Sequence, residues 1–366
     1  MRAAAVRQVA ALKQQCLGKN QSLPSSCYTD PEFLALEEKK VLKGGWVCLG
    51  RVDEVPNVGD YFATQILSEP LVVVRSATDI INVFANVCQH RAMKVAQGNG
   101  NTQKFVCPYH AWSYALDGSL RSAPLIEKKS LPRDCGLPKV KSECWGGFVF
   151  ATLNSRPAAL SKRLSGLYGD IGQYQPEHMH HLQSFQETWD CNWKSLVENF
   201  LDGYHLSVVH PRTLRPLTPT KLCTTMSKST TYTGYIANYA KAAPQRKNHS
   251  PLLNASEQRQ SRLFCIYPSM VASVSPDTLV YLSLQPQGTD RVQVKWGISS
   301  YEANLSTREK NARIKKWQAI NHEDHGILQE LHQGLKSSFY RGGVLAPANL
   351  EGAVSDFHDY LINRLS

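Results

Sequence analysis

Two short cysteine–histidine pairs constrain this chain more than any other feature of its sequence. Cys88-Gln89-His90 is followed, after sixteen residues, by Cys107-Pro108-Tyr109-His110, so each segment offers one thiolate and one imidazole. Such a set can hold a 2Fe-2S cluster, with two cysteines on one iron and two histidines on the other, or a structural zinc ion. The interleaved Cys-His, Cys-His order differs from the Cys-Cys, His-His order of a zinc finger and favours the iron–sulfur cluster.

The residues around these pairs favour a small all-β domain. Apolar segments at 71–74 and 80–85 flank a polar Ser-Ala-Thr-Asp turn, and further turn residues break the region up to about residue 152 into short strands. The chain has 366 residues, which exceeds the usual size of one domain. We therefore expect one domain at 45–155 and a second at 156–366. Residues 1–44 are expected to form a helical segment that packs on the second domain.

The second domain is expected to combine an antiparallel sheet with covering helices, which places the chain in the α+β class. Apolar segments at 279–284 and 292–298 flank a turn that contains Pro and Gly, so they predict a hairpin. Apolar residues at helical spacings predict one helix over about 193–209. They predict another from Ser306, a favoured N-cap residue type, to about Leu335.

The first of these helices carries a group of possible metal ligands. His205 and His210 are candidates for the two imidazoles of a 2-His-1-carboxylate centre, which binds Fe(II) and leaves coordination positions open. A separation of five residues is not one face of a regular helix, so a local widening or a helix end is expected between them, and Pro211 fits that expectation. Asp202 lies three residues before His205 and is expected on the same helical face.

The second helix offers the carboxylate. Its apolar residues form a stripe with Asp324 in the middle, and a buried carboxylate is costly unless it is paired or binds a metal. The members of the stripe are Ile320, Ile327, Leu328, Leu331 and Leu335. Glu323 lies about 100° around the helix from Asp324 and is the second choice.

Taken together, these motifs resemble the Rieske ring-hydroxylating oxygenase family. The resemblance rests on CQHR at 88–91, CPYHAWSYALDG at 107–118, NWK at 192–194, EN at 198–199, DGYH at 202–205, HP at 210–211, and the Glu323-Asp324 pair followed by QGL at 333–335. Most members have Gly where Ala111 stands. The resemblance implies a Rieske domain before a catalytic domain that binds mononuclear Fe(II).

The resemblance also implies roles and partners. Asp202 would link a cluster histidine of a neighbouring subunit to His205 as an electron bridge, the chains would form a ring of three, and Asn199 is a further candidate catalytic residue. The sequence has no nicotinamide or flavin fingerprint. NAD(P)H would therefore act through a separate flavin or iron–sulfur reductase, or a ferredoxin.

The chain looks most like the branch that oxidises choline, glycine betaine or carnitine, because of the EDxxI…QGL helix, the length and the closing AVSDFHDYL. Aromatic residues could form a cage for a methylated ammonium, and the first candidates are Tyr204, Tyr235, Tyr267 and Tyr281. Ring hydroxylation of an aromatic acid is the alternative activity. An iron–sulfur electron carrier without oxygenase activity is a second alternative.

Charge and composition narrow the remaining classes. The net charge is +11, but no nucleic-acid motif accompanies it, and no stretch approaches the ~18 apolar residues that span a bilayer. Ten cysteines in 366 residues are too sparse for a disulfide scaffold and favour a reducing, cytoplasmic location. The basic N-terminus is expected to be a surface helix rather than a targeting segment. Basic residues gather at 121–141, a stretch that could dock an acidic electron donor. They also gather at 212–256, a segment without Asp or Glu. This second segment either attracts an anionic substrate or electron donor or is a solvated loop. The latter segment contains Arg212, Arg215, Lys221, Lys228, Lys241, Arg246 and Lys247.

Overall fold

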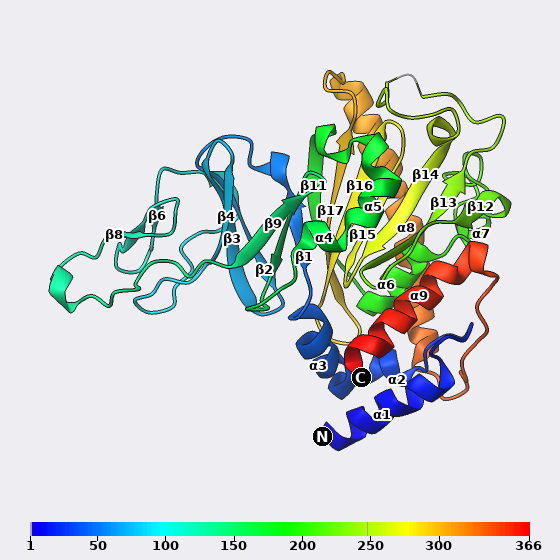
Figure 1. Cartoon of the computed structure of the whole chain (residues 1–366), viewed down its shortest axis with the longest axis horizontal. Coiled ribbons are helices and arrows are strands. Elements are labelled where there is room, and N and C mark those ends of the chain that lie inside the picture. The colour runs from blue at the N-terminus through cyan, green and yellow to red at the C-terminus, as the bar shows by residue number, and fades with distance from the viewer. Residues whose placement is uncertain (1, 247) are drawn as a thin grey trace. The chain divides into compact units, whose positions relative to one another are not determined.

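The chain divides into two compact units in the computed structural model, which describes residues 2–246 and 248–366, so that Lys247 lies outside the described residues (Figure 1). Within the described residues, the large unit contains residues 2–46, 158–246 and 248–366, and the small unit contains Val47–Pro157. The expected domain limits at 44/45 and 155/156 lie within two residues of these boundaries.

The small unit is built from three antiparallel sheets, with the orders β1-β10-β9, β4-β3-β2-β5 and β6-β7-β8. The hairpin of β3 and β4 pairs Val72 with Phe84 around the expected turn, and both side chains enter the core of the unit together with Trp112. The strands are β1 (Val47–Arg51), β2 (Asp60–Ile66), β3 (Glu69–Ala77), β4 (Ile80–Ala85), β5 (Asn99–Asn101), β6 (Phe105–Val106), β7 (Ser113–Tyr114), β8 (Leu120–Ser122), β9 (Lys141–Trp145) and β10 (Phe148–Thr152).

The large unit is organised around an antiparallel sheet of seven strands among the described residues, in the order β11-β17-β16-β15-β14-β13-β12. The expected hairpin is formed by β16 and β17, where Leu282 pairs with Trp296. The strands are β11 (His180–Trp189), β12 (Cys223–Thr225), β13 (Tyr232–Asn238), β14 (Gln260–Ile266), β15 (Met270–Val274), β16 (Thr278–Pro286) and β17 (Val292–Ser300).

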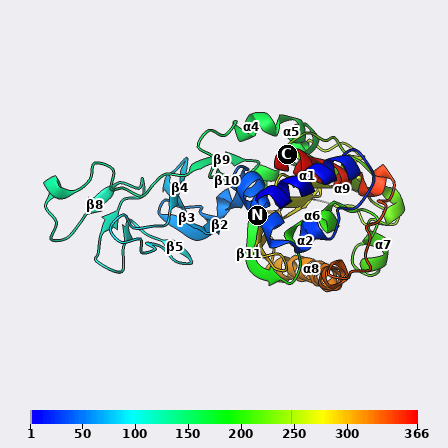
Figure 2. The same ribbon diagram turned by 90° about the horizontal axis from the view of Figure 1, so that it is seen from below.

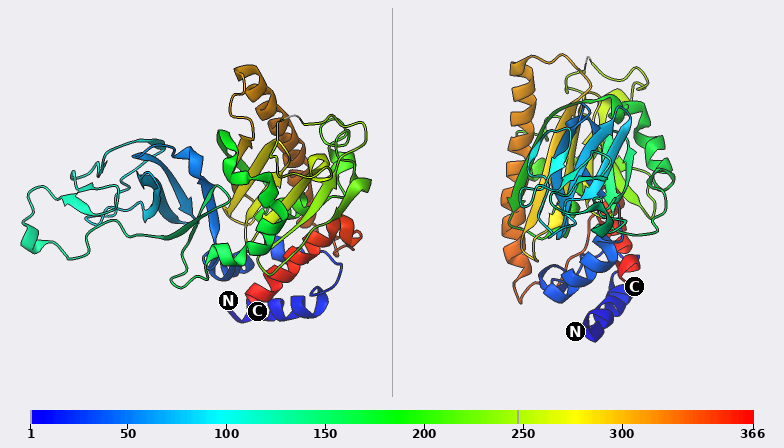
Figure 3. Two further views of the ribbon diagram at one scale, coloured as in Figure 1. Left: turned by 45° about the horizontal axis from the view of Figure 1, so that its top comes forward. Right: turned by 90° about the vertical axis from the view of Figure 1, so that its left-hand side faces the viewer.

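Helices cover this sheet on both faces. Figures 2 and 3 show α8 along one face and α5 along the other. α6 packs on β14, β15 and β16 on the α8 side, whereas α9 contacts β12 and β13. The helices are α1 (Arg2–Gln15), α2 (Ser26–Thr29), α3 (Pro31–Glu37), α4 (Leu160–Arg163), α5 (Ser165–Ile171), α6 (Trp193–Leu201), α7 (Leu206–Val209), α8 (Thr307–Leu335) and α9 (Ala348–Leu365).

The N-terminal segment is part of the large unit. α1 contacts α9, and Val9, Leu12 and Phe33 enter the same core cluster as Trp193 and Phe357. This core joins residues from both ends of the chain and from the sheet. No helix in the described ranges is both long and apolar enough to cross a bilayer.

One helix differs from its expected bounds. The helix expected over 193–209 is interrupted, because Asp202 adopts extended backbone angles (φ −95°, ψ 115°) and ends α6. The carboxylate of Asp202 accepts a hydrogen bond from the backbone N–H of Tyr204, and the N–H of Gly203 donates to the carbonyl of Leu350 at 2.8 Å. These bonds replace those that a continuing helix would make. Asp202 and His205 therefore do not share a helical face, contrary to the expectation.

Candidate active site

The two cysteine–histidine loops of the small unit are built alike. In each loop the cysteine carbonyl accepts a hydrogen bond at 3.0 Å from an alanine N–H four residues later, Ala92 after Cys88 and Ala111 after Cys107. Both alanines are left-handed, with φ of +60° and +57°. A left-handed residue turns the chain back, so that each thiol and the following imidazole can face the same space. Ala111 therefore stands at a position where glycine is the residue without strain.

The side chains of the two loops separate into an inner and an outer pair. The Cys88 and Cys107 thiols are buried, whereas His90 and His110 are exposed, with ring centroids 4.6 Å apart. The Tyr114 hydroxyl lies 3.2 Å from Cys88 Sγ and accepts a hydrogen bond from the Gln89 N–H at 3.0 Å. Thiolates inside and imidazoles at the surface are the donor set that a Rieske cluster requires, so these residues fit that group.

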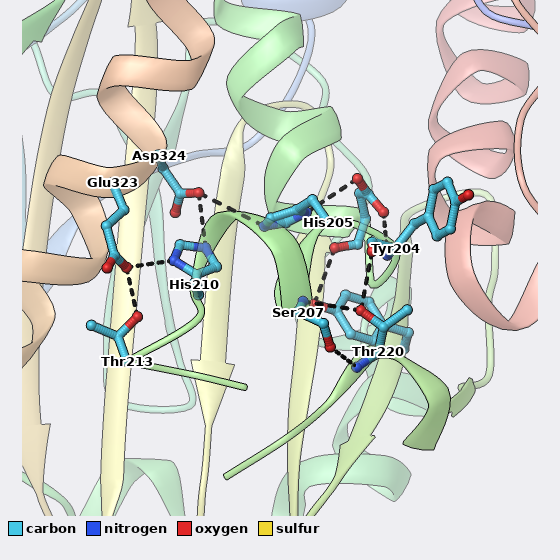
Figure 4. A network of polar contacts seen from close by, with 10 residues as sticks. Tyr204, His205, Ser207, His210, Thr213, Thr220, Glu323 and Asp324 are labelled. Atoms are coloured by element: carbon cyan, nitrogen blue, oxygen red, sulfur yellow. Dashed lines mark hydrogen bonds and ion pairs between the residues drawn. The ribbon is translucent and has the colours of Figure 1, made fainter. Parts of the chain in front are cut away.

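A second group of ligand types converges in the large unit (Figure 4). His205 and His210 come from the segment after α6, and Asp324 comes from the middle of α8. His210 Nε2 lies 3.0 Å from Asp324 Oδ1, and His205 Nε2 lies 3.7 Å from the same oxygen. One ligand atom from each of the three residues lies within 4.8 Å of the other two, which is the spacing of atoms that share one metal ion.

The outer nitrogen of each imidazole is held by a carboxylate. His205 Nδ1 is 3.1 Å from Asp202 Oδ2, and His210 Nδ1 is 2.7 Å from Glu323 Oε2. The Thr213 hydroxyl donates to the same Glu323 oxygen at 2.6 Å. These contacts orient both Nε2 atoms toward Asp324, as expected for ligand histidines with carboxylate partners. Glu323 thus lies on the far side of His210 from the convergent atoms.

Two buried atoms of the centre lack a hydrogen bond within the described chain. His210 Nε2 and Asp324 Oδ1 are 3.0 Å apart, but their orientation is not that of a hydrogen bond. Atoms that are close without bonding each other fit a common third partner, and a divalent cation satisfies both. Burial lowers the pKa of His210, but the carboxylates of Asp324 and Glu323 outweigh this effect and raise it. The site thus attracts positive charge.

A cavity of about 310 Å³ opens beside these three residues. Its walls come from α6, α8 and one face of the sheet, and Asn199 is among the lining residues. Aromatic side chains on its walls are Trp189, Phe200, Tyr235, Tyr239 and Trp317. A substrate in this cavity would be held against the histidine–carboxylate centre.

Of the four tyrosines proposed for a cage, the cavity includes Tyr235. Tyr204 lies in the break between α6 and α7 with 58% of its surface exposed. Tyr267 is buried and stacks on Tyr360 of α9, with ring centroids 4.1 Å apart. Tyr281 pairs with Ala272, which neighbours cavity-lining Ser273, so alternation along the strands places it on the opposite sheet face. The assignment of these three to the cavity is therefore corrected.

Several lining residues were missed in the sequence. Arg313, Lys316 and Trp317 line the cavity from α8. They lie eleven, eight and seven residues before Asp324, which are helical spacings on one face. Extending the stripe of Asp324 backward along the helix would have identified them.

Two protein-family models match the chain. The model of the Rieske 2Fe-2S domain matches residues 45–141. The model described as the ring hydroxylating alpha subunit (catalytic domain) matches residues 172–366, more than half of the chain. The expected Rieske domain, with its 2Fe-2S cluster, and the expected non-haem iron oxygenase domain are confirmed.

Individual proteins resemble the chain over long stretches. The carnitine monooxygenase oxygenase subunit of Escherichia coli (strain K12) is 26% identical over 354 residues, 93% of this chain and 92% of that protein. The glycine betaine monooxygenase oxygenase subunit of Chromohalobacter salexigens is 34% identical over 204 residues, 54% of this chain and 45% of that protein.

A solved quaternary ammonium Rieske monooxygenase has the same fold, with a TM-score of 0.83 at 20% identity over 94% of this chain and 96% of that one. The α+β class is confirmed by this likeness and by the observed sheets. The chain belongs to the family of ring-hydroxylating oxygenase alpha subunits, in which a Rieske domain accompanies the catalytic domain.

Proposed function

We propose that this chain is the terminal oxygenase component of a multicomponent system that hydroxylates or N-demethylates a small quaternary ammonium compound with O2. The observation that carries this proposal is the convergence of His205, His210 and Asp324 beside a cavity with aromatic walls. The names of the two relatives above, carnitine and glycine betaine monooxygenase oxygenase subunits, support the substrate class.

In this proposal each metal group has its own ligands. His205, His210 and Asp324 would hold Fe(II), Cys88 and Cys107 would hold one iron of the cluster, and His90 and His110 would hold the other. When bound, the mononuclear iron supplies a site for O2 activation, and the cluster supplies electrons. The protein contributes orientation, because Asp202 and Glu323 fix the two imidazoles.

The walls of the cavity suit a methylated ammonium. Phe200 and Tyr235 present aromatic surface, which attracts a cation through its ring face. The carboxylate of Asp324 adds negative charge at the same end. Asn199 is the polar lining residue of α6 and remains our candidate for a contact with the substrate.

We further propose that electrons enter each catalytic domain from a neighbouring chain in a homotrimer. His90 and His110 are exposed, so a partner can reach them. Asp202 keeps 19% of its side-chain surface exposed while it holds His205, and the adjacent Tyr204 and Val208 expose 58% and 80% of their surface. An exposed apolar rim around a partly exposed carboxylate fits a contact with a second copy. Inter-subunit electron transfer is named for the related solved monooxygenase.

Electrons from NAD(P)H would arrive through a separate reductase or ferredoxin. The stretch at 121–141 carries five exposed basic residues besides Lys129, which pairs with Glu127 at 2.8 Å. They are Arg121, Lys128, Arg133, Lys139 and Lys141. Leu125, whose side chain is fully exposed, lies among them. Positive charge around an apolar side chain suits an acidic electron donor.

The test combines metal analysis with product analysis. Purified protein should contain about three irons and about two acid-labile sulfides per chain. With reductase, NAD(P)H and O2, quaternary ammonium compounds should yield formaldehyde if the reaction is N-demethylation, or a hydroxylated product without formaldehyde. Zinc without sulfide, or turnover of aromatic acids alone, would contradict the proposal.

Ring hydroxylation of an aromatic acid is the second candidate activity. The basic residues Arg246, Arg313 and Lys316 on the cavity wall favour a substrate with a carboxylate, which an aromatic acid also carries. Identification of the product separates this activity, because ring hydroxylation yields a hydroxylated aromatic acid and leaves quaternary ammonium compounds unconsumed. A simple electron carrier would leave the histidine–carboxylate centre and its cavity without a role.

A further inference from the structure

The cavity is elongated along α8. Its lining residues on this helix recur every three or four positions from Glu309 to Asp324, which places them on one face along about 22 Å of helix. Asp324, at the iron centre, is eight residues after Lys316. At 1.5 Å per residue, the two lie about 12 Å apart along the axis.

The sheet gives an independent measure of the same length. Tyr235 and Tyr239 both line the cavity and lie four residues apart on and just after β13, about 13 Å in an extended strand. The Tyr235 hydroxyl lies 3.5 Å from the carbonyl of Asp202, at the iron centre. Tyr239 lies at the other end, where its hydroxyl contacts Ser261 Oγ at 2.8 Å and the charges of Arg246 and Asp277 act on it.

The far end of the cavity carries more positive than negative charge. Arg313 and Arg246 approach the same carboxylate oxygen of Asp277, at 3.1 and 3.5 Å. Glu309 is engaged by the Ser306 N-cap of α8. Lys316 has neither a hydrogen bond nor an ion pair with any residue in the described part of the chain.

Two further features show that nearby acidic groups do not fully neutralise the positive charges of Arg246 and Lys316. Arg246 Nε is buried and has no hydrogen-bond partner among residues 2–246 and 248–366. Burial, followed by the charge of Arg246, lowers the pKa of Lys316, while Asp277 acts in the opposite direction. An anionic ligand group would therefore be stabilised at this end.

We propose that Lys316, with Arg246 and Arg313, forms a carboxylate-binding subsite, so that the substrate is a zwitterion whose carboxylate lies several bonds from its quaternary ammonium group. This proposal rests on the proposed function and adds the second charge and the length of the substrate. The ammonium lies at the Asp324 end, beside Phe200 and Tyr235, and the carboxylate lies at the basic end. The separation of the ends favours a linker of about three methylenes over one. Choline, which has no carboxylate, is disfavoured.

The experiment measures binding to the iron- and cluster-loaded protein by calorimetry. The ligands are γ-butyrobetaine, glycine betaine and 4-(trimethylammonio)butan-1-ol, which replaces the carboxylate with an uncharged hydroxymethyl group. Wild-type protein should bind γ-butyrobetaine roughly 10-fold or more tightly than the alcohol, as expected for a hydrogen-bonded charge. Tighter binding of glycine betaine than of γ-butyrobetaine would overturn the proposed length.

Lys316→Met removes the charge and keeps most of the side-chain volume. Because Lys316 keeps solvent-exposed surface, we expect a loss of roughly 10-fold for γ-butyrobetaine and no change for the alcohol. Lys315→Met is the matched control, since Lys315 is exposed and is absent from the cavity wall, and it should change neither affinity. The subsite would be rejected if Lys316→Met weakened the binding of both ligands equally, or if it left the affinity for γ-butyrobetaine unchanged.

Failure of the subsite and failure of the proposed function give different results. If quaternary ammonium ligands do not bind but benzoate binds and requires Lys316, the carboxylate subsite stands and the quaternary ammonium substrate class is rejected. If the alcohol and γ-butyrobetaine bind equally well in all variants, the substrate class stands and the subsite is rejected.

Discussion

Glu323 and Asp324 are neighbours in the sequence, yet they approach opposite nitrogens of His210. Asp324→Asn should therefore remove a metal ligand and lower the iron content from about three to about two per chain, with sulfide unchanged. Glu323→Gln should keep the iron but weaken its binding by roughly 10–100-fold, as a change in a residue that orients a ligand does. Iron and sulfide analysis after dialysis against a mild chelator measures both. Loss of iron in Glu323→Gln with retention in Asp324→Asn would reverse the two roles.

Tyr114 is placed to tune the cluster. Its hydroxyl already accepts a bond from the Gln89 N–H, so its proton is available to Cys88 Sγ at 3.2 Å. Hydrogen bonds to the sulfurs stabilise the reduced, more negative cluster. Tyr114→Phe should lower the reduction potential by roughly 20–60 mV, which corresponds to one hydrogen bond in a one-electron couple.

Tyr109→Phe is the control for this change, because Tyr109 is exposed and its hydroxyl accepts a hydrogen bond from Arg91 instead of contacting sulfur. Redox titration should find its potential close to wild type. Equal potentials in all three proteins would show that the Tyr114 hydroxyl does not affect the cluster.

At the residue level the sequence was most informative where one side chain broke a pattern. Asp324 stands out in the sequence because a carboxylate interrupts an apolar stripe, and the structure brings it to His205 and His210. The location of the tyrosines was harder to predict, because tyrosine occurs in cores, in cavity walls and on surfaces. Whether Tyr281 faces the cavity depends on strand register, and a shift of one residue reverses the answer.

At the scale of elements, α6 is joined to the N-terminal segment by a buried ion pair. Lys194 of α6 and Glu37 of α3 are both fully buried, with Nζ 2.9 Å from Oε2, and Trp193 Nε1 donates to the same oxygen at 3.2 Å. Asn192 caps α6 and donates to the carbonyls of Tyr28 and Thr289. The NWK motif at 192–194, which the chain shares with the family, therefore positions the helix that precedes the iron ligands.

Lys194→Met should destabilise the large unit by about 3–5 kcal/mol, since it leaves the charge of Glu37 buried without its partner. Pairing the change with Glu37→Leu should recover much of that loss. Urea denaturation gives the free energies of unfolding. Lys228→Met is the control, because Lys228 is exposed and its pair with Asp356 should contribute less than about 1 kcal/mol. If Lys194→Met costs no more than the control, the buried pair does not hold α6 in place.

The two helices beside the iron centre, α6 and α8, show what local patterns can predict. The bounds of α8 were close to expectation because its signals are local: Ser306 and Glu309 form a capping box, and the apolar stripe runs to Leu335. The break after α6 was placed too late, because it depends on the bond from Gly203 to Leu350, a residue far along the chain. Such a partner has no signature near residue 202.

At the scale of the whole molecule, recruitment of the electron donor should depend on charge. Lys128→Glu combined with Arg133→Glu should raise the KM for the reductase several-fold at low ionic strength, because both side chains are exposed in the basic stretch. The difference should fade near 1 M salt, where the Debye length is about 3 Å. Lys162→Glu, an exposed lysine of α4, is the control for net charge. A salt-independent KM would contradict electrostatic docking at this stretch.

The homotrimer with transfer between chains predicts a particular behaviour of mixed assemblies. His90→Ala removes a cluster ligand and His205→Ala removes an iron ligand, so each variant alone should be inactive. When they are co-expressed in equal amounts, mixed rings form, and each contact between two neighbouring chains is one junction. Some junctions join an intact cluster in one chain to an intact iron centre in the next. Random mixing in a closed ring makes these about one quarter of all junctions, so activity should return to about one quarter of wild type.

Mixing wild type equally with the double variant His90→Ala/His205→Ala separates the two routes of transfer. Transfer between chains again requires two intact neighbours and yields about one quarter of wild-type activity, whereas transfer within a chain requires only one intact chain and yields about one half. Sedimentation must show that mixed rings form and turnover must be expressed per total chain. No recovery in the first mixture together with one half in the second would place both steps in one chain, and the exposed rim around Asp202 would then need another partner.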